Sequence, residues 1–322
     1  MKCEIIFMQN KGNPMKKITV GVITYKRPQG LKKLLDSICE QAIDNIEVDV
    51  LIVDNDTAGE NNETIESLRK TAPYNLLLFV EKEKGIVKAR NRVVSEFLKT
   101  DSEALIFVDD DEWPVKTDWI QTLIETQKNK DADIIYSNVE IIPETDQLSW
   151  TKDAFTGNSM GSDIVITDKF YTNNILIRRN VLEEMHPLFD MRFAMTGSSD
   201  LHFCMKANKE GYIAYFTPHA PVQEIFHSSR ATLKWFFLRG YRIGEGSTRV
   251  YLYEESFPKK YLHIFTLFFG RFARIIQNLL MATVLLKKSY LARATMYTGT
   301  TLGTIAGLFG LKYNEYEKTH GK

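Results

Sequence analysis

Three consecutive carboxylates, Asp109, Asp110 and Asp111, follow the apolar run 104–108. Because unpaired carboxylates side by side repel one another, their position after a buried strand calls for a compensating charge. Magnesium-like cations bind one or two carboxylates together with phosphate oxygens, and they neutralise the charge of a phosphate leaving group. The triplet therefore indicates a metal–diphosphate site. The alternative interpretation is an acidic, solvated turn or a helix N-cap.

The elements that would position these acids alternate between strand and helix. Apolar, β-branched runs predict strands over residues 17–25, 48–56, 74–80, 103–108 and 132–142. Apolar residues at helical spacing predict helices between them, over residues 28–41, 61–70, 85–98 and 117–127. This alternation predicts an α/β fold with a doubly wound, mostly parallel sheet covered by helices on both faces. Ligands bind outside the carboxyl ends of such strands, where Asp54 and the acid triplet lie.

The second half of the chain is less regular. Residues 143–170 are polar and predict loops, followed by a strand and helix over 170–185. A loop, a helix and a glycine stop are expected over 197–211, and a basic helix over 231–244. Side chains in the loops 143–170 and 190–198 are expected to select the substrates.

The net charge of zero hides an asymmetry along the chain. Residues 1–225 contain 26 basic and 36 acidic residues, whereas residues 226–293 contain 12 basic and three acidic ones. A basic segment on an acidic body predicts an anionic partner. Interleaved Trp, Phe and Tyr among long apolar stretches favour a membrane surface over nucleic acid, so no nucleic-acid partner is expected.

Residues 257–312 form the apolar part of this basic region. An apolar stretch interrupted by Arg271 and Arg274 is typical of an amphipathic helix in a membrane interface. The uncharged stretch 294–311 contains Gly299, Gly303 and Gly307 at the four-residue spacing of closely packed membrane helices. Surface attachment is the favoured interpretation. A membrane span and a helical hairpin packed on the rest of the protein are the alternatives.

The N-terminus and the cysteines add two expectations. The first residues lack the apolar core of a signal peptide, and Met15 offers a second start, so residues 1–14 are interpreted as an extension. Cys3, Cys39 and Cys204 are far apart in sequence, which argues against a disulfide framework or a zinc site and fits a reducing compartment.

Seven motifs in order give the chain a resemblance to the family 2 glycosyltransferases, which have the GT-A fold. They are VGVITYKRP…LKKLLDSI, VLIVDND, GIVKARNRVV, ALIFVDDDEWP…WI, TNNILIRRNVL, GSSDLHF and RATLKWFFLRGYRIG, over about residues 16–246. Within that family the sequence is similar to bacterial exopolysaccharide glucosyltransferases of the succinoglycan-biosynthesis type.

The resemblance implies a nucleotide site built from several segments. The turn after the first strand would hold the base through Thr24, Tyr25 and Arg27. Asp54, which ends the second strand, would contact uracil or ribose, and Arg90 would lie near the base and phosphates.

The acid triplet matches the DXD motif of the family. The resemblance implies that Asp109 faces the ribose, that Asp111 binds Mn²⁺ or Mg²⁺, and that Asp110 lies between them in the nucleotide site.

Asp200 matches the catalytic base of the family, at the start of a predicted helix. It would accept the proton of the acceptor hydroxyl as that oxygen attacks the anomeric carbon. Ser199 stands where the family often has Glu, so only one candidate carboxylate remains. The alternative role for Asp200 is an N-cap, which Ser198 or Ser199 could equally provide.

The stretch 221–230 departs from relatives that place a histidine ligand here. The resemblance instead implies that Glu224 contacts the metal or orients the loop and that Arg230 binds the diphosphate, with His227 as a rival ligand. Further along, Lys234, Arg239 and Arg242 are expected to meet diphosphates or membrane phosphates, or else to form a solvated helix face.

Thr172, Asn173 and Asn174 would line the acceptor pocket, although Asn residues are also common in turns.

The expectation is therefore an inverting, metal-dependent transferase of surface polysaccharide assembly. It would move a sugar from a UDP-sugar to a hydroxyl of a growing or polyprenyl-diphosphate-linked glycan, peripherally at the cytoplasmic face of the inner (plasma) membrane. Residues 15–250 would form the GT-A domain and residues 251–322 a helical, membrane-associating tail. The alternatives are a nucleotidyltransferase, a non-catalytic glycan- or membrane-binding scaffold, and a glycoside hydrolase.

Overall fold

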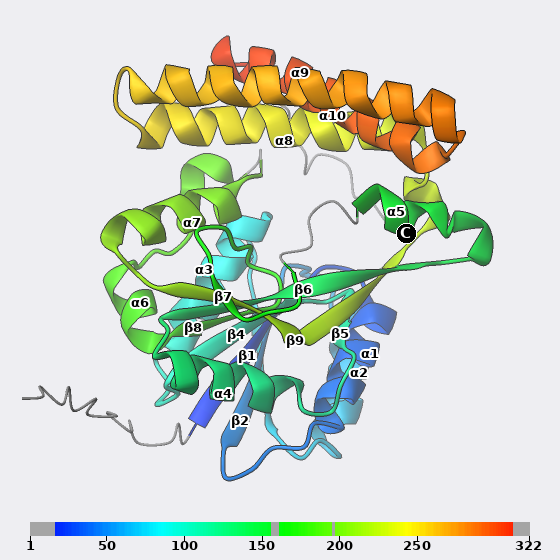
Figure 1. Cartoon of the computed structure of the whole chain (residues 1–322). Coiled ribbons are helices and arrows are strands. Elements are labelled where there is room, and N and C mark those ends of the chain that lie inside the picture. Colours follow the sequence, from blue (N-terminus) through cyan, green and yellow to red (C-terminus); the bar gives the residue numbers. More distant parts are fainter. Residues whose placement is uncertain (1–16, 156–160, 195–196, 312–322) are drawn as a thin grey trace, which may run out of the picture.

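The computed structural model describes residues 17–155, 161–194 and 197–311. Within these residues one nine-stranded sheet crosses the molecule, and three long helices form a layer over one side of it (Figure 1). The expected extension, residues 1–14, lies outside the described residues, as do parts of the two loops expected to select the substrates.

The first half of the sheet is parallel. β1 (Lys17–Thr24) pairs on one side with β2 (Glu47–Asp54) and on the other with β4 (Ala104–Asp109), and β3 (Asn75–Val80) pairs with β2. The connecting helices are α1 (Pro28–Cys39), α2 (Asn62–Arg69) and α3 (Ile86–Phe97). The predicted doubly wound α/β fold is confirmed here, with element ends within about two residues of those expected.

The second half of the sheet is mixed. β8 (Ile175–Arg178) runs antiparallel between β4 and β6 (Ile134–Pro143), and β9 (Ala214–Phe226) runs parallel to β6. β9 also pairs antiparallel with two short strands, β5 (Glu112–Pro114) and β7 (Val165–Ile166). The helices of this half are α4 (Trp119–Lys130), α6 (Arg179–Glu184) and α7 (Ser199–Glu210).

Alternate residues of the central strands enter two separate cores. Ile18, Val20 and Val22 of β1 pack with α1, α2 and α4 on one face. On the other face, Leu105 and Phe107 of β4 pack with α3, α6 and α7. Burial on both faces explains why these strands read as almost continuous apolar runs.

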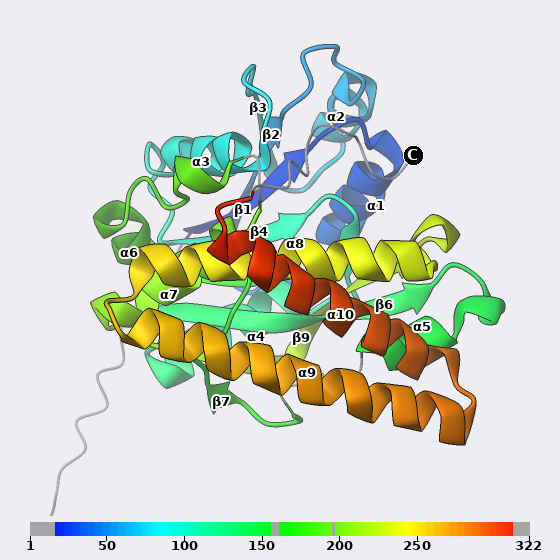
Figure 2. The ribbon, with the colours of Figure 1, turned by 90° about the horizontal axis from the view of Figure 1, so that it is seen from above.

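The helical layer consists of α8 (Leu233–Glu254), α9 (Lys259–Leu285) and α10 (Lys288–Leu308). Seen from above, α10 crosses between α8 and α9 (Figure 2). The short helix α5 (Trp150–Phe155), in the segment expected to be loop, packs on α10, and aromatic side chains of α5, β9 and α8 form a third core beneath the layer. The expected domain boundary at residue 250 falls inside α8.

Helices α8 and α10 touch backbone to backbone. A Cβ atom added at Gly240 would lie 2.0 Å from the carbonyl oxygen of Met296, and one added at Gly303 would lie 2.0 Å from that of Tyr241. Glycines on both helices therefore permit this approach, as at small-residue interfaces between membrane helices.

Helix α9 forms the outer edge of the layer. Apolar side chains along it are exposed, including Phe265, Phe269, Phe272 and Ile276. Among the described helices, α9 alone is long and apolar enough to cross a membrane, judged by length and composition, and 11% of its most apolar window is buried in the protein. Arg271 faces inward, where it donates hydrogen bonds to Thr304 and Ser247.

Candidate active site

The acid triplet lines a cavity of about 430 Å³ at the carboxyl ends of β1 and β4. The cavity walls come from the turn after β1, the β4–β5 segment, the start of α3, the end of β9 and one face of α8. Eight of the residues that the resemblance assigns to the nucleotide and the metal line this cavity: Thr24, Tyr25, Arg27, Asp109, Asp110, Asp111, Glu224 and Arg230. The fold thus brings together residues separated by more than 200 positions in sequence.

Arginines compensate the negative charge of the triplet. Nη1 of Arg27 donates to Asp110 at 2.9 Å and to Asp111 at 2.7 Å. Arg90 pairs with Asp109 at 3.2 Å from just outside the cavity lining, and the hydroxyl of Thr24 donates to Asp110 at 2.7 Å. Arg27 and Arg90, both expected near the base, therefore also hold the acids in place.

Glu224 meets the triplet from β9. Its carboxylate accepts a hydrogen bond from Arg230 at 2.5 Å, and Arg230 also lies 3.9 Å from Asp111. The antiparallel pairing of β5 with β9 sets Glu112 opposite Glu224. Glu112, which sequence reasoning missed, is buried: one carboxylate oxygen accepts from Asn173 at 2.9 Å, and the other is buried without a hydrogen-bond partner.

Burial perturbs the carboxyl groups of this cluster. Desolvation raises the pKa of Asp109, where Arg90 opposes it, and raises the pKa of Asp110 to about 7. The pKa of Glu112 lies well above its usual value because of burial and the neighbouring charge of Asp109. Burial and the charge of Asp111 raise the pKa of Glu224, against the influence of Arg230 and Arg239. Extra positive charge at this point would favour the ionised forms.

This arrangement fits a divalent cation bound jointly with a ligand. In residues 17–155, 161–194 and 197–311, no three His, Cys, Asp or Glu side chains form a ready-made metal group. Ions such as Mg²⁺ typically take only one or two protein carboxylates and complete their shell with water and phosphate oxygens. Oxygen donors at Asp111 and Glu224, beside the unpartnered Glu112 oxygen, suit such an ion.

Asp54 lies outside the cavity lining. It is 1% exposed, and its carboxylate accepts hydrogen bonds from Asn61 and from the backbone of Asp56, both at 2.9 Å. Its neighbour Asn55 lines the cavity instead and binds the backbone of Glu81, Glu83 and Gly85, which fixes the loop before α3. Asn55 was missed because its role depends on that distant loop.

His227 lies away from the acid cluster. Its side chain is half exposed and pairs with Glu144 at 3.1 Å, and it is not among the cavity residues. Of the acceptor-pocket candidates, Asn173 lines the cavity, whereas Asn174 is fully buried and bonds to Trp119 and to the backbone of Asn138 and Ala220.

Asp200 is the second residue of α7 and lies outside the cavity lining. Its charge contributes, after burial, to the raised pKa of Tyr171. Tyr136 packs edge-on against Tyr171 at 5.9 Å. Burial raises the pKa of Tyr136, and the charges of Glu112 and Asp200 add to that rise. The candidate base and the acid cluster thus lie within electrostatic reach of the same tyrosine.

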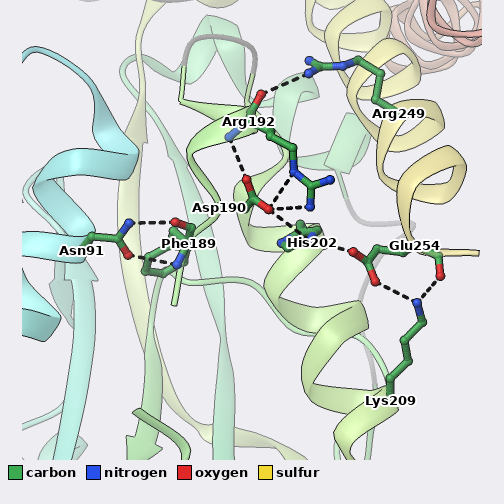
Figure 3. Close-up of polar contacts among 8 residues, drawn as sticks. All are labelled: Asn91, Phe189, Asp190, Arg192, His202, Lys209, Arg249 and Glu254. Atoms are coloured by element: carbon green, nitrogen blue, oxygen red, sulfur yellow. Dashed lines mark hydrogen bonds and ion pairs between the residues drawn. The ribbon is translucent and has the colours of Figure 1, made fainter. Parts of the chain in front are cut away.

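A polar network holds α7 and the preceding segment (Figure 3). His202 of α7 lies 3.0 Å from Glu254, which ends α8, and Lys209 pairs with the same carboxylate at 2.8 Å. Arg249 of α8 donates to the backbone of Arg192 at 3.1 Å, and Arg192 pairs with Asp190 at 2.6 Å. The helix that carries Asp200 is therefore anchored to the helical layer.

The anchoring extends to α3. The side chain of Asn91 exchanges two hydrogen bonds with the backbone of Phe189, at 2.7 and 3.0 Å. Asn91, within the KARN stretch, thus joins α3 to the segment that precedes α7.

Helix α8 contributes a wall that the sequence only partly indicated. Trp235, Arg239 and Arg242 line the cavity. Their spacing of four and three residues places them on one helix face. The two arginines were expected near phosphates. Trp235 was missed because the helix face that points to the cavity depends on how α8 packs on the rest of the protein.

Comparison with known proteins agrees with this architecture. The profile described as Glycosyl transferase family 2 matches residues 19–196, more than half of the chain. The succinoglycan biosynthesis protein ExoM of Rhizobium meliloti (strain 1021) is 25% identical over 302 residues, which cover 92% of this chain and 94% of ExoM.

Two solved structures share the fold. The mannosyltransferase PcManGT of Pyrobaculum calidifontis, in complex with GDP-Man and Mn²⁺, has a TM-score of 0.62 at 17% identity and covers 91% of this chain and 87% of that one. TarS 1-349 of S. aureus, in complex with UDP, has a TM-score of 0.53 at 16% identity, with 95% of both chains covered. The family expected from the seven motifs is confirmed: the chain belongs to glycosyltransferase family 2 and is a glycosyltransferase with a GT-A fold.

Proposed function

We propose that this enzyme transfers a sugar from a UDP-sugar to a hydroxyl of a growing or lipid-linked glycan, with inversion at the anomeric carbon and with Mn²⁺ or Mg²⁺ as cofactor. The observation that carries the proposal is the meeting of Asp111, Glu224, Arg27 and Arg230 in one cavity at the carboxyl ends of the strands. Family membership favours this reaction over nucleotidyl transfer and over a non-catalytic scaffold.

The donor would lie along the eight cavity residues that the resemblance assigns to the nucleotide and the metal. The ring of Tyr25 is flanked by the ammonium groups of Lys26 and Lys84, at 5.8 and 5.4 Å, and offers a surface for the base. Asp109 and Asp110 are held by Arg90 and Arg27, at the end where the ribose would bind. TarS has been solved with UDP, which supports a uridine nucleotide.

The diphosphate would lie at the cluster of Asp111, Glu224 and Arg230. A cation held there by Asp111 and Glu224 would neutralise the negative charge of the departing UDP. Arg27 and Arg230 would add positive charge once their carboxylate partners bind the cation. PcManGT was solved with Mn²⁺, which supports a divalent metal.

Asp200 would act as the base. As the acceptor hydroxyl attacks the anomeric carbon, the carboxylate takes its proton, and the bond to UDP breaks in the same in-line step. Tyr136 and Tyr171 would border the acceptor, because the charge of Asp200 contributes to the raised pKa of each ring hydroxyl.

The helical layer supports peripheral attachment to a membrane. The exposed apolar side chains of α9 form a surface that a lipid interface would cover, and the basic residues of the layer favour anionic lipids. The similarity to ExoM, a succinoglycan biosynthesis protein, supports a place in surface polysaccharide assembly. The enzyme would then work at the cytoplasmic face of the membrane on a polyprenyl-diphosphate-linked acceptor.

The test is isothermal titration of the whole chain with UDP, with Mn²⁺ present and then with EDTA. Asp111→Asn is compared with Asp36→Asn, a partly exposed carboxylate on α1 that pairs with Lys32. We expect micromolar UDP binding that disappears with EDTA and in the Asp111 variant, but persists in the Asp36 variant.

UDP binding that is equal with and without metal would contradict the metal assignment. Binding of GDP or dTDP in place of UDP would contradict the proposed donor.

A further inference from the structure

Glu112 differs from the other residues that line the cavity. Its side chain is 2% exposed, and one of its carboxylate oxygens has no hydrogen-bond partner. Of the cavity-lining residues in the part of the chain that the structure describes, Glu112 alone has a buried side-chain oxygen or nitrogen that is unpaired. Because an unpaired buried carboxylate oxygen costs free energy, this atom indicates a bound group that donates a hydrogen bond to it.

Asn173 holds the other oxygen of the same carboxylate. Its side-chain amide donates to Glu112 at 2.9 Å, and Asn173 also lines the cavity. An amide has two N–H groups and one oxygen, so this contact uses only part of its hydrogen-bonding capacity. A carboxylate oxygen beside such an amide can accept from one hydroxyl group while the amide binds the next. Adjacent hydroxyl groups of this kind are the polar surface of a sugar ring.

The residue after Asn173 fixes the position of this amide. Asn174 is fully buried and has a φ of 56°, in the left-handed region. Its side chain donates to the backbone carbonyls of Asn138 and Ala220, at 3.0 and 2.8 Å, and accepts from Trp119 at 2.9 Å. With Asn174 held by three hydrogen bonds, the turn that presents Asn173 is rigid before a ligand binds.

The pair lies between the metal cluster and the candidate base. On one side, the pairing of β5 with β9 sets Glu112 opposite Glu224. On the other side, Tyr136 of β6 pairs with the first residue of β8, just after Asn173. Burial raises the pKa of Tyr136, and the charges of Glu112 and Asp200 add to that rise. In an in-line displacement the transferred sugar lies between the leaving group and the attacking oxygen, which is this region of the cavity.

We infer that Glu112 and Asn173 bind hydroxyl groups of the donor sugar and so hold that sugar between the leaving diphosphate and Asp200. The inference rests on the proposed function, because it requires a UDP-linked sugar in this cavity. The sequence suggested the acceptor pocket for Asn173, whereas its contact with Glu112 assigns it to the transferred sugar. The free oxygen of Glu112 is likewise assigned to a hydroxyl group rather than to the cation.

The test is isothermal titration of the whole chain, with Mn²⁺ present, against UDP and against UDP-glucose, UDP-galactose and their N-acetyl forms. UDP reports on the nucleotide and the metal, and the best-bound UDP-sugar reports in addition on the sugar. Glu112→Gln keeps an oxygen that accepts from Asn173 and replaces the free oxygen with an N–H donor. Asn173→Ala removes the amide. Glu140→Gln, at an exposed glutamate of β6 outside the cavity lining, is the matched control.

We expect Glu112→Gln and Asn173→Ala each to weaken binding of the best-bound UDP-sugar by roughly tenfold or more, as for the loss of a hydrogen bond to a charged group. Affinity for UDP should stay at the wild-type level in both variants. Retained UDP binding also shows that the variants are folded and still bind the metal. Glu140→Gln should bind UDP and the UDP-sugar as the wild type does.

Equal losses of affinity for UDP and for the UDP-sugar in Glu112→Gln would overturn the inference and assign Glu112 to the cation. Unchanged affinity for the UDP-sugar in both variants would also overturn it. In either case the proposed function stands, because the wild type binds UDP. Failure of UDP to bind the wild type would instead contradict the proposed function, and the inference with it.

Discussion

Gly244 of α8 lies directly against the carbonyl group of Thr300 of α10: a Cβ atom at position 244 would be 2.0 Å from that oxygen. The contact is with backbone, so it cannot be relieved by a side-chain rotation. We expect Gly244→Ala to separate the two helices and to lower the free energy of unfolding by about 1–3 kcal/mol, the range for overpacking. Thermal unfolding followed by calorimetry measures this.

Gly270→Ala is the matched control for this prediction. Gly270 lies in α9, and a Cβ there has no neighbour within 4 Å. Replacing a helical glycine with alanine should stabilise the protein by about 0.5–1 kcal/mol. Equal effects at the two positions would contradict the close approach of α8 and α10.

Asp200→Asn should abolish proton acceptance while leaving the donor site intact. We expect a fall in kcat of about 10²–10⁴-fold, the usual contribution of a general base, with UDP affinity unchanged. The assay is sugar transfer with the donor selected from UDP-glucose, UDP-galactose and their N-acetyl forms. Glu210→Gln, at the other end of α7, is the control. A variant that keeps full kcat would exclude Asp200 as the base.

The outer face of α9 should mediate membrane attachment. Replacing Phe265, Phe269 and Phe272 with Gln removes exposed aromatic surface without touching a core, and each change should weaken vesicle binding by about 1 kcal/mol or more. Flotation with vesicles containing phosphatidylglycerol measures this. Ile166→Gln, an equally exposed apolar residue on β7, is the control. Unchanged flotation of the triple variant would show that α9 does not face the lipid.

His202 should make stability fall in mild acid. Burial lowers its pKa, although the charges of Glu254 and Asp190 oppose this, so the folded protein favours the neutral ring. As the pH falls below about 6.5, the unfolded chain takes up a proton that the folded chain resists, and the unfolding free energy decreases.

His202→Gln should therefore flatten the loss of stability between pH 7 and pH 5 in denaturant titrations. The exposed His219→Gln is the control and should leave the slope unchanged. A His202 variant with the wild-type slope would show that this ring does not resist protonation in the fold.

The sequence by itself determined the first half of the fold. Strands β1 to β4 and their helices follow from local apolar periodicity, because each strand is buried on both faces and each helix on one. The parallel order then placed Asp109–Asp111 at the edge where ligands bind. The seven motifs likewise sufficed to identify the family.

Only the tertiary structure decided which distant residues share the cavity. A three-residue strand, β5, pairs with β9 and sets Glu112 opposite Glu224, and no local pattern marks so short a strand. Asp54 was expected in the site, but the structure places it outside the cavity lining, where Asn61 and the Asp56 backbone satisfy its carboxylate.

The helical layer shows the same division. The spacing of Gly299, Gly303 and Gly307 predicted a close-packed helix, but not that its partner is α8. Helix α8 also carries Trp235, Arg239 and Arg242. The packing of α10 on α8 therefore decides which face of α8 points to the cavity. Side-chain direction at such a contact depends on packing between elements far apart in sequence, which local periodicity does not encode.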